Sequence, residues 1–108
     1  RSGEWRSTPV NVLTVEGDRF LVAPRGEAQW VRNVRAAGGG ELRVGRQVEA
    51  FTATELADAD KPVVLRPYLR RWGFEVGTFF DGVDADASDE ELVAAGPKHP
   101  VFRLASAP

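Results

Sequence analysis

The start of the chain carries a short basic run that also contains a glycine and a proline. Its members are Arg1, Ser2, Gly3, Arg6 and Pro9. Guanidinium groups bind phosphate and carboxylate groups through paired hydrogen bonds, and glycine lets the backbone approach such a ligand closely. Each charged hydrogen bond of this kind contributes about 1.5–3 kcal/mol. The run therefore predicts a loop that binds an acidic ligand.

A second group of residues follows the first predicted hairpin. It consists of a short loop and two residues of the helix behind it: Ala23, Pro24, Arg25, Gly26, Trp30 and Asn33. The N-terminus of a helix carries a partial positive charge that favours anions. We expect the basic run, this loop and the helix N-terminus to meet at one edge of the sheet and to hold phosphate or carboxylate groups.

In this order and spacing, the residues resemble the deazaflavin-dependent nitroreductase family, which binds coenzyme F420. Members of that family carry a G-R-x-S/T-G-x-x-R-x-x-P run, then a V-A-x-x-G loop with a basic residue or serine after the alanine, and then a W-x-x-N helix. The basic run matches the first motif, residues 22–26 match the second with a shorter loop, and Trp30 and Asn33 match the third. The resemblance covers about the first half of the chain.

The resemblance implies a split β-barrel, usually dimeric, that holds F420 in a groove. Arg1 and Arg6 would meet the phosphate and the polyglutamate tail of the coenzyme, and the loop 23–26 would line the region from the phosphate to the ring. Trp30 and Asn33 would lie near the ring or support the loop. The implied activity is hydride transfer from reduced F420 to a small activated alkene, quinone or nitro compound, with no covalent nucleophile.

Two alternatives remain open from the residues. A related split barrel could bind FMN, whose single phosphate needs fewer basic contacts than a polyglutamate tail. The chain could also be a non-enzymatic binding or interaction module, in which the aromatic stretch from Trp72 to Phe80 forms a hydrophobic contact surface.

Several single residues have a structural alternative to a functional role. Tyr68 is the only tyrosine in the chain and is the candidate proton donor, although packing is the commoner role for such a residue. Trp30 at helical spacing is more often a core residue than a cofactor wall, and Asn33 fits a bridge within the helix equally well. His99 lacks a carboxylate motif nearby, which argues against a metal or acid–base role.

The acidic stretch 84–91 does not change this interpretation. It superficially suggests a calcium loop, but it lacks the glycine and the terminal glutamate spacing of one. We therefore expect a solvated surface there and no metal site.

Alternating apolar residues predict an antiparallel sheet. Strands are expected at residues 8–15, 19–23, 41–44, 47–54 and 100–104. The turn Glu16-Gly17-Asp18 joins the first two strands, and Gly45-Arg46 joins the next two. The last strand is expected to close the sheet.

Helical spacing predicts a helix between the two hairpins and a helical insert near the C-terminus. The first helix is expected at residues 27–37, ended by the glycines at 38–40. Pro62 fits near the start of the second helix, but Pro67 is awkward inside a helix, so a start at Pro67 is the alternative. A capping box of Ser88 and Glu91 starts a short helix that ends at Ala95. This element order predicts a small barrel or an α+β fold. The resemblance implies that it is a split β-barrel of the FMN-binding type, in the mainly β or α+β class.

The whole chain sets further limits. Its 108 residues fit one domain spanning 1–108, and the lack of methionine predicts that an N-terminal segment is missing. A net charge of −2 gives no sign of a nucleic-acid partner. The absence of cysteine excludes disulfides and thiolate chemistry. No stretch is long and apolar enough to span a bilayer, so a cytoplasmic protein is the expectation. The resemblance to the deazaflavin-dependent family implies a homodimer.

Overall fold

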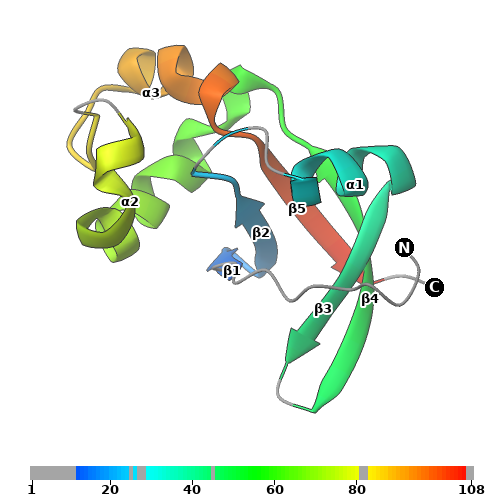
Figure 1. The fold of residues 1–108 in the computed structure, drawn as a ribbon. Helices are drawn as coiled ribbons and strands as arrows, with labels where there is room; N and C mark the ends of the chain where they lie inside the picture. The colour runs from blue at the N-terminus through cyan, green and yellow to red at the C-terminus, as the bar shows by residue number, and fades with distance from the viewer. Residues whose placement is uncertain (1–11, 25, 27–28, 45, 81–82, 107–108) are drawn as a thin grey trace.

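The computed structural model describes residues 12–24, 26, 29–44, 46–80 and 83–106, with the backbone alone for residues 43, 44, 74–76, 78 and 79. Figure 1 shows a twisted antiparallel sheet with one helix on one side and the remaining helices on the other. None of the helices in the described ranges is long and apolar enough to cross a membrane.

Within the described residues, five strands form the sheet. They are β1 (Val12–Val15), β2 (Asp18–Val22), β3 (Gly39–Val44), β4 (Gln47–Glu55) and β5 (Val101–Ser106). Their order is β1-β2-β5-β4-β3, and every neighbouring pair is antiparallel. The two predicted hairpins, β1–β2 and β3–β4, are confirmed over the residues described.

The last strand lies in the middle of the sheet and joins the two hairpins. Leu21 of β2 is opposite Phe102 of β5, and Leu104 of β5 lies between Arg19 and Ala53 of the two neighbouring strands. Without β5 the hairpins would share no backbone hydrogen bonds in the described sheet. The C-terminal segment therefore holds the two halves of the sheet together.

The sheet is open rather than closed. In the described part of the chain, β1 and β3 are edge strands that do not pair with each other. The prediction of a split β-barrel needs correction in this respect: the fold is a mixed α/β arrangement with a five-stranded antiparallel sheet and three α-helices, compatible with a split barrel but not a closed one.

Glycines set the start of β3. Gly38 has a φ of +73° and ends the first helix, as glycine commonly does at this position. Gly39 and Gly40 are already part of β3, so one glycine ends the helix and not three. A Cβ atom at Gly39 would collide with the Phe51 carbonyl group. The small residue there lets β3 lie close against β4.

The sheet separates two cores. Helix α1 (Gln29–Ala37) covers one face, where Val31 and Val34 pack with Leu21, Phe51 and Phe102. On the other face lie α2 (Pro62–Val76) and α3 (Asp89–Ala95) with the short 3-10 turns η1 (Asp58–Asp60), η2 (Gly77–Phe80) and η3 (Gly96–Lys98). The second core is the larger, and its members are Leu13, Phe20, Val22, Val64, Leu65, Tyr68, Leu69, Phe80, Leu92 and Val101.

Helix α2 begins at Pro62 and continues through Pro67, so the alternative start at Pro67 is wrong. Proline inside a helix costs about 3 kcal/mol because it removes a hydrogen bond and crowds the preceding turn. Val64, Leu65, Tyr68 and Leu69 are all buried on one face of this helix. Full burial of a large apolar side chain contributes about 1.5–3 kcal/mol, so four of them outweigh one proline.

Helix α3 begins as predicted. The Ser88 hydroxyl oxygen accepts a hydrogen bond from the Glu91 backbone N–H, and the Glu91 carboxylate accepts one from the Ser88 N–H. Arg66 of α2 also donates to the Ala87 carbonyl oxygen and pairs with Asp89 at 2.8 Å. The capping box is confirmed, and α3 is tied to α2.

Candidate functional site

The loop that follows β2 runs along the segment that precedes β5. The Ala23 N–H donates a hydrogen bond to the Pro100 carbonyl oxygen at 2.9 Å, and the Gly26 N–H donates to the Ala23 carbonyl oxygen at 3.2 Å. The first bond continues the β2–β5 pairing by one residue, and the second closes a tight turn. The predicted ligand loop is thus attached to the end of the central strand.

Gly26 has the backbone geometry that glycine provides. Its φ is +84°, a region that costs other residues about 1–2 kcal/mol. A Cβ atom at this position would also lie 3.1 Å from the Lys98 carbonyl oxygen. Residue 26 therefore passes close to η3, and glycine satisfies both constraints.

His99 forms a further contact with the loop. Its side chain is buried, and its Nδ1 atom lies 3.0 Å from the Pro24 carbonyl oxygen. The imidazole stacks on the Phe80 ring with a centroid distance of 3.8 Å and an interplanar angle of 16°. This role of His99 was not predicted, because the residue was considered only for a metal or acid–base role. Nothing in the sequence pattern connects two residues 75 positions apart.

The two candidate residues of α1 differ in burial. Trp30 is partly buried and packs on Phe102, with ring centroids 6.1 Å apart. Asn33 is exposed, and its side-chain oxygen accepts a hydrogen bond from Gln29 Nε2 at 3.1 Å. The packing role of Trp30 and the helix-bridging role of Asn33 are therefore both present, and each residue keeps an accessible part.

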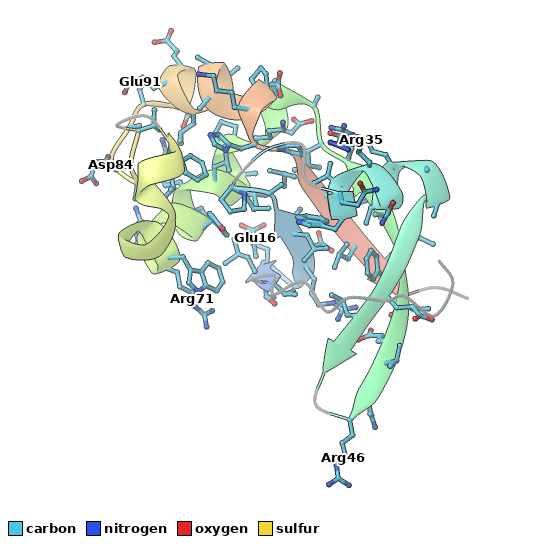
Figure 2. The ribbon with its side chains drawn as sticks, viewed as in Figure 1. Glu16, Arg35, Arg46, Arg71, Asp84 and Glu91 are labelled. Carbon is cyan, nitrogen blue, oxygen red and sulfur yellow. The ribbon has the colours of Figure 1, made fainter. Side chains whose placement is uncertain are left out.

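Two arginines of the first half of the chain pair with carboxylates of β4. Arg35, in the last turn of α1, holds Glu55 through two hydrogen bonds of 2.7 and 2.8 Å (its side chain is labelled in Figure 2). These bonds lower the pKa of Glu55 more than its partial burial raises it. Arg19 holds Glu49 in the same two-bond manner at 2.8 and 3.1 Å, which lowers the pKa of Glu49 and raises that of Arg19. Arg19 therefore links β2 to β4, and Arg35 links α1 to β4.

The comparison with known families decides the identity of the chain. The sequence model of the family described as F420H(2)-dependent quinone reductase matches residues 1–76. The chain belongs to this family. It is therefore an oxidoreductase, and its cofactor is coenzyme F420, which confirms the predicted cofactor over the FMN alternative. Neither the search of curated proteins nor the search of solved structures found a match.

F420H2-dependent quinone reductases bind an anionic coenzyme. In this member of the family, the loop after β2 and the first turn of α1 have two features that suit an anion. The first turn of α1 holds no acidic side chain, so nothing within that turn neutralises the positive end of the helix. The loop before it is anchored by backbone hydrogen bonds at Ala23 and Gly26. In the described part of the chain no cluster of three metal-binding side chains occurs.

Several predicted coenzyme residues lie outside the described residues. They are Arg1, Ser2, Gly3, Arg6, Pro9 and Arg25. Of the remaining ones, Ala23, Pro24 and Gly26 lie in the loop after β2, and Trp30 and Asn33 lie on helix α1, which begins three residues after Gly26.

Tyr68 lies in a different place. It belongs to the core on the α2 face, buried against Trp72 and Phe80 with ring centroids 5.2 and 6.3 Å away. Trp30 belongs to the core on the opposite face. This placement favours packing as the role of Tyr68. Phe80 is the last residue of the aromatic stretch 72–80, which forms the contact surface in the alternative of an interaction module. It is likewise a core residue.

Proposed function

We propose that the chain reduces a quinone with reduced F420, and that the loop after β2 and the start of α1 bind the coenzyme. The observation that carries this proposal is the family match over residues 1–76, which includes every predicted coenzyme residue. The anchored loop and the helix N-terminus without acidic residues in its first turn support it.

The proposed contacts divide by chemistry. Arg1 and Arg6, with Ser2, Gly3 and Pro9 shaping their loop, meet the phosphate and the acidic tail of the coenzyme. The loop 23–26 lies along the phosphate-to-ring region through its backbone and the Arg25 guanidinium group. Trp30 offers an apolar ring face and Asn33 an amide near the deazaflavin ring.

The hydride chemistry belongs to the bound coenzyme, and the protein supplies binding, orientation and electrostatics. A quinone that gains a hydride and one proton becomes a hydroquinone. Because Tyr68 is buried in the core, we propose that the proton comes from solvent and not from the Tyr68 hydroxyl group.

The proposed acceptor is a quinone, with activated alkenes and nitro compounds as the alternatives. Steady-state oxidation of reduced F420 with one small member of each class ranks them by kcat/KM. We expect the quinone to rank first. A higher kcat/KM for the nitro compound or the alkene would assign the acceptor to that class instead.

A binding titration tests the coenzyme site. KM values of enzymes commonly lie between about 1 μM and 1 mM, so F420 is titrated across that range by its absorbance. We expect Arg6→Ala and Arg25→Ala each to raise Kd about 10- to 150-fold, as the loss of a charged hydrogen bond of about 1.5–3 kcal/mol predicts.

Arg46→Ala is the matched control. Arg46 is exposed at the tip of the β3–β4 hairpin, and Figure 2 shows it pointing away from the rest of the protein. We expect the control to bind F420 as tightly as the parent chain. Equal weakening by all three substitutions would show only a general charge effect and would count against the proposed contacts.

We also propose a homodimer, which the resemblance to split-barrel enzymes implies. Light scattering during gel filtration gives the mass directly. A monomeric mass with full F420 binding would exclude a site that needs two copies.

A further inference from the structure

We propose that His99 is a positioning residue for the coenzyme: its Nδ1–H holds the Pro24 carbonyl group and thereby sets the shape of the loop that receives F420. This inference rests on the proposed function of that loop. The Nδ1 atom is 3.0 Å from the Pro24 carbonyl oxygen. A carbonyl oxygen only accepts, so Nδ1 must carry the hydrogen.

The packing around the imidazole fixes the direction of this N–H. The ring is 2% exposed and stacks on Phe80, which is itself 1% exposed. Phe80 packs on Tyr68, and Tyr68 packs on Trp72. A row of four rings thus connects α2 to the loop. Because its imidazole is held on one side by this row, His99 presents its donor to the loop from a fixed position.

Three successive residues before β5 contact the loop. The Lys98 carbonyl oxygen lies where a Cβ atom at Gly26 would meet it at 3.1 Å, His99 donates to Pro24, and Pro100 accepts from Ala23. We call residues 98–100 the clamp. Its base is held by the buried Lys61, whose ammonium group donates to the Gly96 carbonyl oxygen at 2.6 Å and pairs with Asp58 at 2.8 Å.

The clamp lies beyond the part of the chain that matches the family. The match ends at residue 76, whereas the loop 23–26 lies inside it. The loop that would touch the coenzyme therefore belongs to the matched region, while the group that sets its shape comes from the C-terminal segment. Among the loop contacts described, His99 supplies the one made by a side chain.

The first test uses the free protein. His99 is the only histidine in the chain, so its imidazole signals need no assignment by mutation. Nitrogen-15 NMR distinguishes a protonated Nδ1 from a protonated Nε2 in the neutral ring. We expect the Nδ1–H tautomer at neutral pH. A ring with its hydrogen on Nε2 would overturn the proposal, because Nδ1 could then not donate to the Pro24 carbonyl group.

The second test moves the donor. The side-chain amide of asparagine can place an N–H near the position of Nδ1, and that of glutamine near Nε2. We expect His99→Asn to keep F420 affinity close to that of the parent chain. We expect His99→Gln and His99→Leu to raise Kd about three- to tenfold, the range for one neutral hydrogen bond.

Two further readouts separate positioning from a general structural role. In His99→Leu the KM for reduced F420 rises while kcat and the KM for the quinone stay unchanged. In the same variant without coenzyme, the Gly26 amide exchanges its hydrogen faster than in the parent chain, because the turn that it closes is no longer held. Leu92→Ala, which removes a core side chain of α3, is expected to lower the melting temperature without either change.

The outcomes separate the two proposals. If the parent chain does not bind F420, the proposed function fails, and the NMR and exchange experiments still judge the clamp. If the parent chain binds F420 and His99→Gln and His99→Leu bind it equally well with unchanged Gly26 exchange, the clamp alone is refuted. Should His99→Leu not fold, the comparison of His99→Asn with His99→Gln decides.

Discussion

The two aromatic residues considered for the site, Tyr68 and Trp30, lie on opposite faces of the sheet. On the α2 face, Tyr68 and Phe80 are each 1% exposed and lie inside the larger core. On the α1 face, one nine-residue helix covers the sheet, and Trp30 remains partly exposed beside an exposed Asn33. In the proposed function the α2 face serves stability and the α1 face serves ligand contact, and His99 connects the Phe80 ring on the first face to the loop after β2.

The largest expected effect concerns the core on the α2 face. Tyr68→Ala should lower the free energy of unfolding by about 3–5 kcal/mol, as removal of a buried aromatic side chain does. Denaturant unfolding followed by tryptophan fluorescence measures this change.

Tyr68→Phe removes only the hydroxyl group and therefore tests whether that group donates a proton in the reaction. General acid catalysis by one side chain contributes about 10²- to 10⁴-fold. We expect kcat to change far less than that, because the hydroxyl group is buried with the core. A loss of kcat in that range, with an intact fold, would restore Tyr68 as the proton donor and break the division between the faces.

The next effect concerns the loop itself. Gly26→Ala should lower the free energy of unfolding by about 1–2 kcal/mol, because residue 26 has a φ of +84°, and it should weaken F420 binding because the new Cβ would press on Lys98. Gly73→Ala is the matched control: its Cβ meets open space within α2. That control should stabilise the protein by about 0.5–1 kcal/mol and leave Kd unchanged. If Gly26→Ala and Gly73→Ala changed the free energy of unfolding and Kd for F420 alike, the loop would have no particular role in binding.

A smaller effect concerns the exposed side of α1. Asn33→Ala should change the free energy of unfolding by less than about 0.5 kcal/mol, as exposed substitutions usually do, while Kd for F420 rises about three- to tenfold. Gln29→Ala removes the same hydrogen bond within the helix from its other partner. If both variants bind F420 like the parent chain, Asn33 has only the bridging role.

The smallest expected effect is a pH dependence on the α1 face. Hydrogen bonds from Arg35 lower the pKa of Glu55 in the folded state, so the unfolded chain binds more protons as the solution becomes acidic. This pair therefore stabilises the protein above the ordinary glutamate pKa, and the contribution is lost as pH falls through the lowered folded value. Glu55→Gln should cost about 0.2–1 kcal/mol at neutral pH and nothing at strongly acid pH. An equal difference at both pH values would contradict the ion pair.

Local sequence signals predicted much of the fold. The turn at Glu16 and Gly17 was recognised from its residues, and both have positive φ values, 50° and 87°, as a tight hairpin requires. The capping box of Ser88 and Glu91 was recognised for the same reason, since each feature depends on residues within a few positions of one another. The sequence did not decide between Pro62 and Pro67 as the start of helix α2, because the local penalty of Pro67 is visible in the sequence, whereas the burial that outweighs it is not.

The candidate site also has some features that local sequence indicates and others that depend on tertiary structure. Residue order alone was enough to identify the coenzyme family, because motifs of this kind are contiguous. The assignment of the loop 23–26 with Trp30 and Asn33 to the coenzyme stays a prediction. Tertiary structure decided that β5 joins the hairpins, that Tyr68 is a core residue, and that His99 holds Pro24. Contacts between residues 75 positions apart depend on how separate elements pack, and no local propensity of either residue contains that information.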